Sequence, residues 1–180
     1  TVLFVGRLLP HKGLEDLIDA ASPALPVRIL GSALDKAYHQ RLISMARDKP
    51  VRFELGLPDE ALVEASRSSA VTVLPSVELT RDGQKVDKSE LLGQTLLESM
   101  ACGTPVVCTR VGGMPEVVEG SGASTVVPPS DPAALGRALL TWLDAPEAIR
   151  SQAGMAGRSH VLARFQWEQV VRRCLEAYAA

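Results

Sequence analysis

The sequence predicts an α/β domain with a doubly wound, parallel β-sheet. Short runs rich in Val, Ile and Leu alternate along the chain with longer stretches whose apolar residues recur at helical spacing. Strands that are apolar throughout are typical of parallel sheets, because helices cover both faces of such a sheet. Regular alternation of strand and helix, with right-handed crossovers, leads to the doubly wound arrangement. At 180 residues the chain is long enough for one domain with a sizeable core.

The expected elements follow in order from the first residue. A buried strand covers residues 1–5, Gly6 allows a tight turn, and Gly13 begins a helix whose apolar residues follow helical spacing. Further strands are expected near residues 27–30, 51–55, 71–74, 106–109 and 125–127. Further helices are expected after Gly93 and near residues 34–47, 59–68, 115–119, 132–143, 147–163 and 167–179. The polar segment 77–89 is long for a strand-to-helix loop, which is typical of functional or mobile loops.

Composition argues against several classes of partner and site. The net charge is −2 and no basic stripe is present, which argues against nucleic acid as a partner. No apolar run approaches the ~18 residues of a membrane-spanning helix. The cysteines Cys102, Cys108 and Cys174 lack metal-ligand spacing, and their apolar or helix-end surroundings predict buried thiols in a reducing compartment. We therefore expect a cytoplasmic protein without a metal site.

Two cations lie in the first strand-to-helix loop. Arg7 and Lys12 flank Pro10 between two glycines, Gly6 and Gly13, directly before a helix N-terminus. The positive dipole end and free N–H groups of a helix N-terminus attract anions. Arg7 can hold phosphate oxygens in a fork, whereas Lys12 acts as a point charge. The loop is therefore a candidate diphosphate site.

Two carboxylates mark the segment 89–107, which reads SELLGQTLLESMACGTPVV. Glu90 precedes a turn at Gly93, and Glu98 is expected two turns into the helix that follows. If the segment were helical throughout, eight positions would separate the carboxylates by roughly 12 Å. The carboxylate pair of a glycoside hydrolase lies only about 5 to 9.5 Å apart. The spacing therefore favours two carboxylates that bind different ends of one elongated ligand.

The two charged loops are expected at the same edge of the sheet. The loop at 6–13 and the segment at 75–93 each follow a strand and precede a helix. In open α/β sheets, ligands bind outside the carboxyl ends of the strands, at the point where the strand order reverses. A single ligand could therefore contact both loops.

These motifs resemble those of a known enzyme family. The spacing of Glu90 and Glu98 is similar to the E-x7-E signature of retaining, nucleotide-sugar-dependent glycosyltransferases of the GT-B fold, in glycosyltransferase family 4. The run G-R-L-x-P-x-K-G at 6–13 resembles their phosphate-binding loop, and GGMPE at 112–116 resembles a family turn to which we assign a structural role. The resemblance covers nearly the whole chain. It implies that residues 1–180 form a Rossmann-like C-terminal domain that binds a nucleotide sugar.

The resemblance also implies roles for individual residues. Arg7 and Lys12 would bind the diphosphate and stabilise the leaving nucleotide, and Glu90 would hydrogen-bond the transferred sugar. Glu98 would accept hydrogen bonds from the ribose, and the loop 55–58 would line the base pocket. The other donor-binding residues that it implies are Gly6, Leu57, Leu91, Leu92, Gly93 and Gln94. The nucleotide-sugar donor would be bound without a metal or another cofactor.

The partners expected of this chain are the donor and a second domain. The chain begins inside a strand, which we interpret as a fragment cut at a domain boundary. The family's N-terminal acceptor domain would then be absent, so we expect the fragment alone to be an inactive part of a hexosyltransferase. The terminal helix within 164–180 would pack on that domain or stand by itself. Peripheral contact with the inner face of the membrane, through the absent domain, stays open.

Two alternative functions remain open at this stage. One is a nucleotide-sugar epimerase or a phosphorylase of the same fold, although the lysine context of a pyridoxal-phosphate-dependent phosphorylase is not found in this sequence. The other is a non-catalytic α/β regulatory domain, which would need no paired cations and carboxylates along one sheet edge. The residues leave the base, the sugar, the acceptor and the oligomeric state undetermined.

Overall fold

A computed structural model describes residues 1–86 and 90–179 of the chain. Over these residues, one sheet of six parallel strands has the order β3-β2-β1-β4-β5-β6. The strands are β1 (Val2–Arg7), β2 (Val27–Ser32), β3 (Val51–Leu55), β4 (Val71–Leu74), β5 (Val106–Thr109) and β6 (Ser124–Val127). The strand order reverses between β1 and β4, which is the topological switch point. The predicted doubly wound, Rossmann-like sheet is confirmed.

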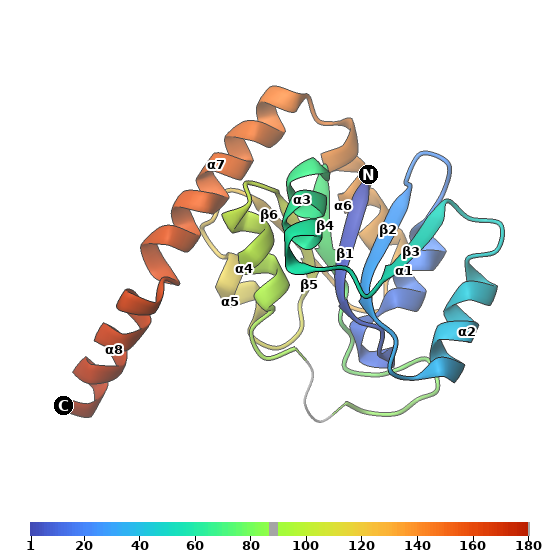
Figure 1. Cartoon of the computed structure of the whole chain (residues 1–180), viewed down its shortest axis with the longest axis horizontal. Helices are drawn as coiled ribbons and strands as arrows, with labels where there is room; N and C mark the ends of the chain where they lie inside the picture. Colours follow the sequence, from blue (N-terminus) through green and yellow to red (C-terminus); the bar gives the residue numbers. More distant parts are fainter. Residues whose placement is uncertain (87–89, 180) are drawn as a thin grey trace.

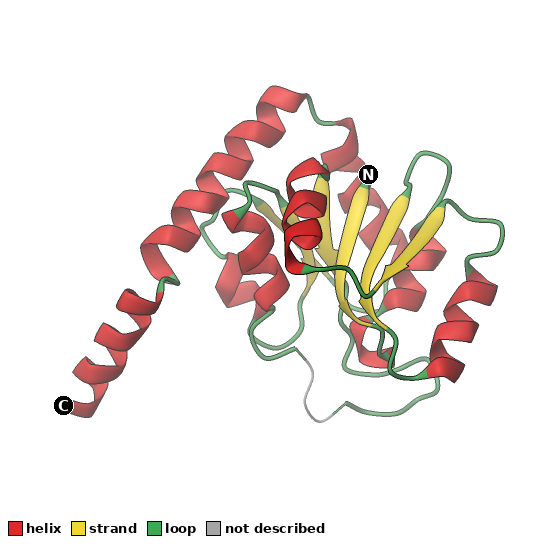
Figure 2. Ribbon diagram, viewed as in Figure 1, coloured by secondary structure: helices red, strands yellow, loops and turns green. Residues whose placement is uncertain are grey.

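Helices cover both faces of the sheet, as Figure 2 shows. On one face α1 packs against α2 and α6, and on the other α4 packs against α3 and α7. Val2, Leu3 and Phe4 of the central strand are all fully buried, because each face of β1 has its own helix layer. The helical elements are the 3-10 helix η1 (Pro10–Lys12), α1 (Leu14–Ala20), α2 (Lys36–Met45), α3 (Asp59–Ser68), α4 (Gln94–Ala101), α5 (Met114–Val118), α6 (Pro132–Asp144), α7 (Glu147–Arg164) and α8 (Trp167–Ala179).

The loops that follow β1, β4 and β5 meet at one edge of the sheet. In Figure 1 the strands run from the edge near the N-terminus to the opposite edge, where these loops lie. The segment after β4 is the longest of them; its residues 77–86 are described, and residues 87–89 of the predicted 77–89 loop lie outside the described residues. The candidate motifs of the sequence therefore share the carboxyl edge.

The predicted start of one helix and the distance estimated between two carboxylates need correction. The second helix starts at Lys36 rather than residue 34, because the Asp35 side chain accepts hydrogen bonds from the backbone of Ala37 and Tyr38 at 2.9 and 3.0 Å and caps the helix. Residues 90–93 precede α4 and are not helical. The predicted separation of roughly 12 Å between the two carboxylates assumed a continuous helix, so it does not apply.

The place of Glu98 within its helix also differs from the prediction. Gly93 has a φ of 72°, a left-handed conformation that halts helical geometry on its N-terminal side. Helix α4 therefore starts at Gln94, and Glu98 is its fifth residue. Glu98 thus lies one turn into the helix, not two.

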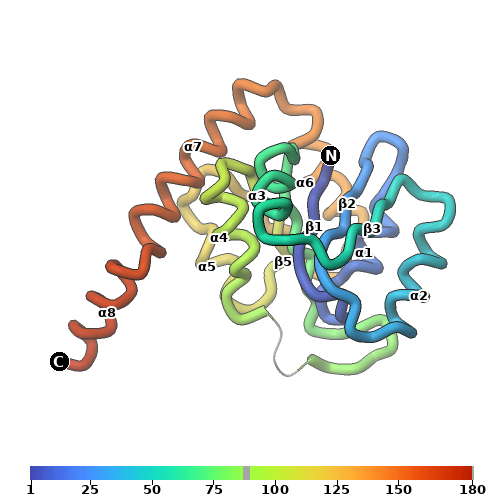
Figure 3. Tube along the Cα trace, viewed as in Figure 1, coloured from blue at the N-terminus to red at the C-terminus, as the bar shows by residue number. Residues whose placement is uncertain are grey.

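The C-terminal helices leave the body of the sheet. Helix α7 runs along α4, and α8 continues outward beyond it (Figure 3). Within α8, Trp167 and Tyr178 are 78% and 89% exposed. The prediction of buried cysteines is correct for Cys108 but wrong for Cys174, which lies exposed on this outward helix, while Cys102 is half-buried. Over the described residues, the helices are all too short or too polar to cross a membrane.

Candidate functional site

The first strand-to-helix loop lies directly against the end of β4. Gly13 has a φ of 67°, and a Cβ on it would come within 1.8 Å of the Pro75 carbonyl oxygen. Only glycine permits this approach. The backbone N–H of Val77 donates to the His11 carbonyl at 2.9 Å and joins the same two segments. The predicted proximity of the two loops is confirmed.

Glycine also brings β1 and β2 together where the loop begins. Gly6 pairs with Gly31 in the parallel register, and a Cβ on Gly31 would lie 1.8 Å from the Gly6 carbonyl oxygen. Arg7 is the last residue of β1, and it is exposed at the carboxyl edge. Its guanidinium is therefore available to a ligand at this edge.

Lys12 and Glu90, which are 78 positions apart in the sequence, form an ion pair. Each side chain is only 14% exposed. The predicted diphosphate cation and the predicted sugar-binding carboxylate are therefore in direct contact, across the gap between the first loop and the segment before α4. The sequence predicted that the two loops share an edge, but it did not predict this contact.

His11 adds no second positive charge to this pair at neutral pH. Burial lowers the pKa of His11, and Lys12 lowers that pKa further, while Glu90 opposes the shift and Arg7 adds a smaller lowering effect. The imidazole is therefore neutral near pH 7. The positive charge of the loop rests on Arg7 and Lys12.

The N-terminus of α4 is fastened to the central strand. The Thr95 hydroxyl donates to the Val5 carbonyl at 3.1 Å. The first turn of α4 carries no acidic side chain, so its N–H groups and dipole are not neutralised within the helix. Two of the predicted donor-binding residues lie at this end of the helix: Gly93 is its N-cap, and the exposed Gln94 is its first residue. The helix end is therefore suited to an anion at the switch point.

Glu98 borders a cavity of about 340 Å³ between α3 and α4. The wall contributed by α3 includes the apolar residues Leu62 and Val63, while Thr95 and Ser99 of α4 offer hydroxyl groups. Ser99 Oγ is buried without a hydrogen-bond partner among the described residues. Asp59 and Ser66 of α3 line it as well, so apolar and polar side chains are mixed around the cavity, as is typical of a small-molecule site.

The remaining predicted donor-binding residues are distributed around this cavity and the helix end. Leu57 packs on the small buried cluster of Leu3, Leu30 and Ala65 rather than in an open pocket. Leu91 is 78% exposed, next to Glu90. Three predicted residues line a second cavity, of about 380 Å³, between α4 and α8; they are Leu92, Gln94 and Glu98.

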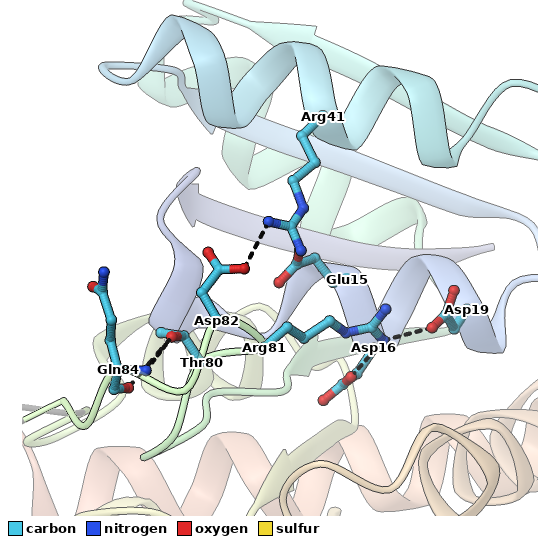
Figure 4. A network of polar contacts seen from close by, with 8 residues as sticks. All are labelled: Glu15, Asp16, Asp19, Arg41, Thr80, Arg81, Asp82 and Gln84. Atoms are coloured by element: carbon cyan, nitrogen blue, oxygen red, sulfur yellow. Dashed lines mark hydrogen bonds and ion pairs between the residues drawn. The ribbon is translucent and has the colours of Figure 1, made fainter.

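The long segment after β4 is held by ion pairs to α1 and α2, as Figure 4 shows. Arg81 donates to Asp16 at 2.8 Å and to Asp19 at 2.5 Å. Arg41 of α2 contacts both Glu15, at 2.8 Å, and Asp82, at 3.0 Å. These contacts fix the described part of the segment against the helices that flank the first loop.

The Glu15 carboxylate of this network is almost fully buried. Burial raises its pKa, and Arg41 and Arg81 oppose that shift. The two arginines therefore support the charged carboxylate beneath the segment. Sequence reasoning missed this network, because its residues are separated by tens of positions and follow no motif.

Comparison with known proteins agrees with this architecture. The model of the family described as glycosyl transferases group 1 matches residues 1–160. The chain is 33% identical over 193 residues to D-inositol 3-phosphate glycosyltransferase of Acidothermus cellulolyticus, an alignment that covers 98% of this chain and 40% of that protein. The chain thus spans about 40% of the length of such curated relatives.

Solved structures show the same fold. Sucrose-phosphate synthase from Thermosynechococcus elongatus superposes with a TM-score of 0.79 at 29% identity, over 99% of this chain and 44% of that one. HepE of Anabaena, solved in complex with UDP and glucose, gives a TM-score of 0.81 at 21% identity, over 99% and 47%. The sheet is that of one domain of a GT-B glycosyltransferase. With a family match over most of its length, the chain belongs to the glycosyl transferases group 1 family.

Proposed function

We propose that this chain is the C-terminal, donor-binding domain of a retaining glycosyltransferase, which moves a sugar from a nucleoside-diphosphate sugar to an acceptor. The observation that carries the proposal is the contact between Lys12 and Glu90 at the switch point of the sheet. It unites a candidate phosphate-binding cation and a candidate sugar-binding carboxylate in one partly buried place. Catalysis would also require the acceptor domain, since the chain spans only about 40% of its relatives' length.

The cations suit the charge that develops during transfer. When the bond between the anomeric carbon and the diphosphate oxygen breaks, the electron pair leaves with the nucleotide. Arg7 at the end of β1 and Lys12 in the next turn would stabilise that growing negative charge, together with the N-terminus of α4. In this proposal the protein's own cations take the role that a metal ion has elsewhere, and the donor is bound without a cofactor.

Lys12 has a second task, which is to make the carboxylate compatible with the diphosphate. A bare carboxylate 4 Å from one phosphate charge would be repelled by about 4 kcal/mol at an effective dielectric constant of 20. Glu90 is paired with Lys12 in the ligand-free chain. The pair therefore permits Glu90 to accept hydrogen bonds from sugar hydroxyls beside a charged leaving group.

The cavity between α3 and α4 supports a place for the nucleoside. Glu98 at its rim would accept hydrogen bonds from the ribose, and the Leu62 and Val63 wall would cover one face of the base. HepE of Anabaena has been solved with UDP and with UDP-glucose, which supports a nucleoside-diphosphate ligand for this fold. The epimerase and regulatory-domain alternatives are not favoured, because the family and the named relatives are glycosyltransferases.

Calorimetry tests the proposed donor binding without requiring the transfer reaction. The chain is titrated with UDP, GDP and ADP and with their glucose conjugates, and at least one nucleotide should bind. Lys12→Ala and Arg7→Ala should each weaken that binding about tenfold or more, because each removes one charge-assisted contact to phosphate. Arg137→Ala, which removes an exposed cation from α6, serves as the control. Absence of binding to every nucleotide, or unchanged affinity in both site variants, would refute the assignment.

A further inference from the structure

The turn between β5 and α5 lies against the backbone of the segment that carries Glu90. A Cβ on Gly112 would come within 1.7 Å of the Glu90 carbonyl oxygen, and a Cβ on Gly113 within 2.3 Å of the Leu91 carbonyl oxygen. Real Cβ atoms essentially never come closer than 3.0 Å to such an atom. Two successive glycines thus meet two successive carbonyls, 22 positions earlier in the chain.

A third contact extends the same support toward α4. Met114 is fully buried, and its Cγ would lie 3.1 Å from a Cβ on Gly93. The residue after the two glycines therefore packs under the N-cap of α4. Together, the turn and the first residue of α5 form a floor beneath residues 90–93.

The two glycines are not explained by the same backbone requirement. Gly112 has a φ of 54°, in the left-handed region that favours glycine by itself. Gly113 has a φ of −83°, which any residue can adopt. The close carbonyl of Leu91 is therefore the reason why a side chain at Gly113 cannot be accommodated.

Lys12 contacts the Glu90 side chain, whereas Gly112 meets the Glu90 carbonyl oxygen. Glu90 is thus held through its side chain by a cation of the first loop and through its backbone by the turn. A Cβ at Gly112 would move the Glu90 carbonyl by about 1.3 Å, and one at Gly113 would move the Leu91 carbonyl by about 0.7 Å, if the segment alone gave way. Either shift would displace the Glu90 carboxylate relative to the phosphate loop.

We propose that Gly112 and Gly113 are positioning residues. Because they lack side chains, they let the backbone of Glu90 and Leu91 approach the turn closely, and this fixes the position from which residues 90–93 recognise the sugar. This inference rests on the proposed function, because it assigns the sugar end of the donor to residues 90–93. Arg7, Lys12 and the α3–α4 cavity supply most of the diphosphate and nucleoside contacts in the proposal, and Gly112 and Gly113 themselves meet only Glu90 and Leu91. Loss of the floor should therefore weaken sugar recognition selectively.

The test compares three glycine-to-alanine variants. Gly113→Ala adds only the steric contact, and Gly112→Ala adds the contact and the backbone strain. Gly120→Ala is the matched control, since Gly120 has a φ of 71° but nothing within 4 Å of an added Cβ. Calorimetry measures the affinity for UDP and UDP-glucose, and for the GDP and ADP pairs, in each variant. Circular dichroism verifies that each variant is folded.

We expect the variants to lose affinity for the nucleotide sugar but not for the corresponding nucleoside diphosphate. Loss of a hydrogen bond to a charged group lowers affinity by roughly ten- to hundredfold, so Gly112→Ala, which causes the larger shift, should weaken nucleotide-sugar binding by about a hundredfold and Gly113→Ala by about tenfold. The affinity for the nucleoside diphosphate should stay within about twofold of the parent chain. Equal weakening of both ligands, or no change in folded Gly113→Ala, would overturn the inference.

Hydrogen exchange gives a readout that needs no ligand. The Leu96 amide donates to the Gly93 carbonyl at 2.8 Å, so its exchange reports on the segment above the floor. Exchange of this amide should be faster in Gly113→Ala than in Gly120→Ala, and equal rates would overturn the positioning role. If the parent chain binds none of the nucleotides, the proposed function fails. The exchange experiment still tests whether Gly113 positions residues 90–93. If Gly113→Ala does not fold, Met114→Leu, which reshapes the contact under Gly93 at similar volume, takes its place in both measurements.

Discussion

The Lys12–Glu90 ion pair is expected to stabilise the ligand-free chain, and a double-mutant cycle measures its contribution. Both side chains are 14% exposed, so the pair lies between two regimes. Exposed ion pairs contribute about 0.2–1 kcal/mol, whereas removal of one partner from a buried pair costs about 3–5 kcal/mol. We therefore expect a coupling free energy of about 1–2 kcal/mol. The cycle consists of the parent chain, Lys12→Met, Glu90→Gln and the double variant.

Urea unfolding followed by circular dichroism gives the free energy of unfolding of all four proteins. For a chain of this length, each kcal/mol also shifts Tm by about 2–4 °C, so thermal unfolding provides an independent check. The exposed pair Arg172–Glu176 of α8, with a separation of 4.0 Å, is the control cycle and should show a coupling of about 0.5 kcal/mol or less. A Lys12–Glu90 coupling no larger than that of the control would refute the reasoning.

Three further predictions concern the site and its surroundings. Glu90→Gln removes the carboxylate that competes for Lys12, so nucleoside-diphosphate affinity should rise several-fold in calorimetry while the added affinity due to the sugar falls; unchanged affinity for both ligands would contradict the assigned role. Burial lowers the pKa of His11 below its ordinary value of 6.5, so the unfolded chain binds more protons than the folded chain at acidic pH. The free energy of unfolding therefore falls as the pH drops below about 6.5. His11→Asn should reduce this loss of stability. Thermal unfolding of both proteins between pH 7.5 and 5 measures this effect, and parallel curves would exclude it. Arg81→Ala should release the segment 77–86 from Asp16 and Asp19, so subtilisin should cleave there faster than in Arg137→Ala; equal cleavage would show that the ion pairs do not hold the segment.

The fold could be predicted from the sequence because its signals are local. The β-branched, mostly apolar runs at 71–74 and 106–109 became strands with the predicted bounds, and Pro58 with Asp59 marked the start of α3 correctly. Errors arose where one side chain or one backbone angle decides a boundary. The Asp35 cap moved the start of α2, and the start of α4 directly after the left-handed Gly93 puts Glu98 one turn into the helix rather than two.

The candidate site was only partly accessible from the sequence. Motif spacing and the direction of parallel strands predicted that the phosphate loop and the two-glutamate segment share an edge. Pairwise contacts across that edge could not be predicted, because they depend on how two loops of different strands pack. The Lys12–Glu90 pair and the network of Arg81 with Asp16 and Asp19 are of this kind.

The sequence by itself determined the succession of strands and helices along the chain and the parallel sheet that they form. It also determined which residue types lie at the carboxyl edge of that sheet. Periodicity and turn residues act over a few positions, so they are readable without coordinates. Only the tertiary structure decided that Lys12 meets Glu90, and that Gly112 and Gly113 lie beneath Glu90 and Leu91. These contacts join residues 22 to 78 positions apart, and their distances follow from the packing of whole elements. The GGMPE run predicted only a turn with a structural role, and the distances of its two glycines to two carbonyls indicate a role in positioning.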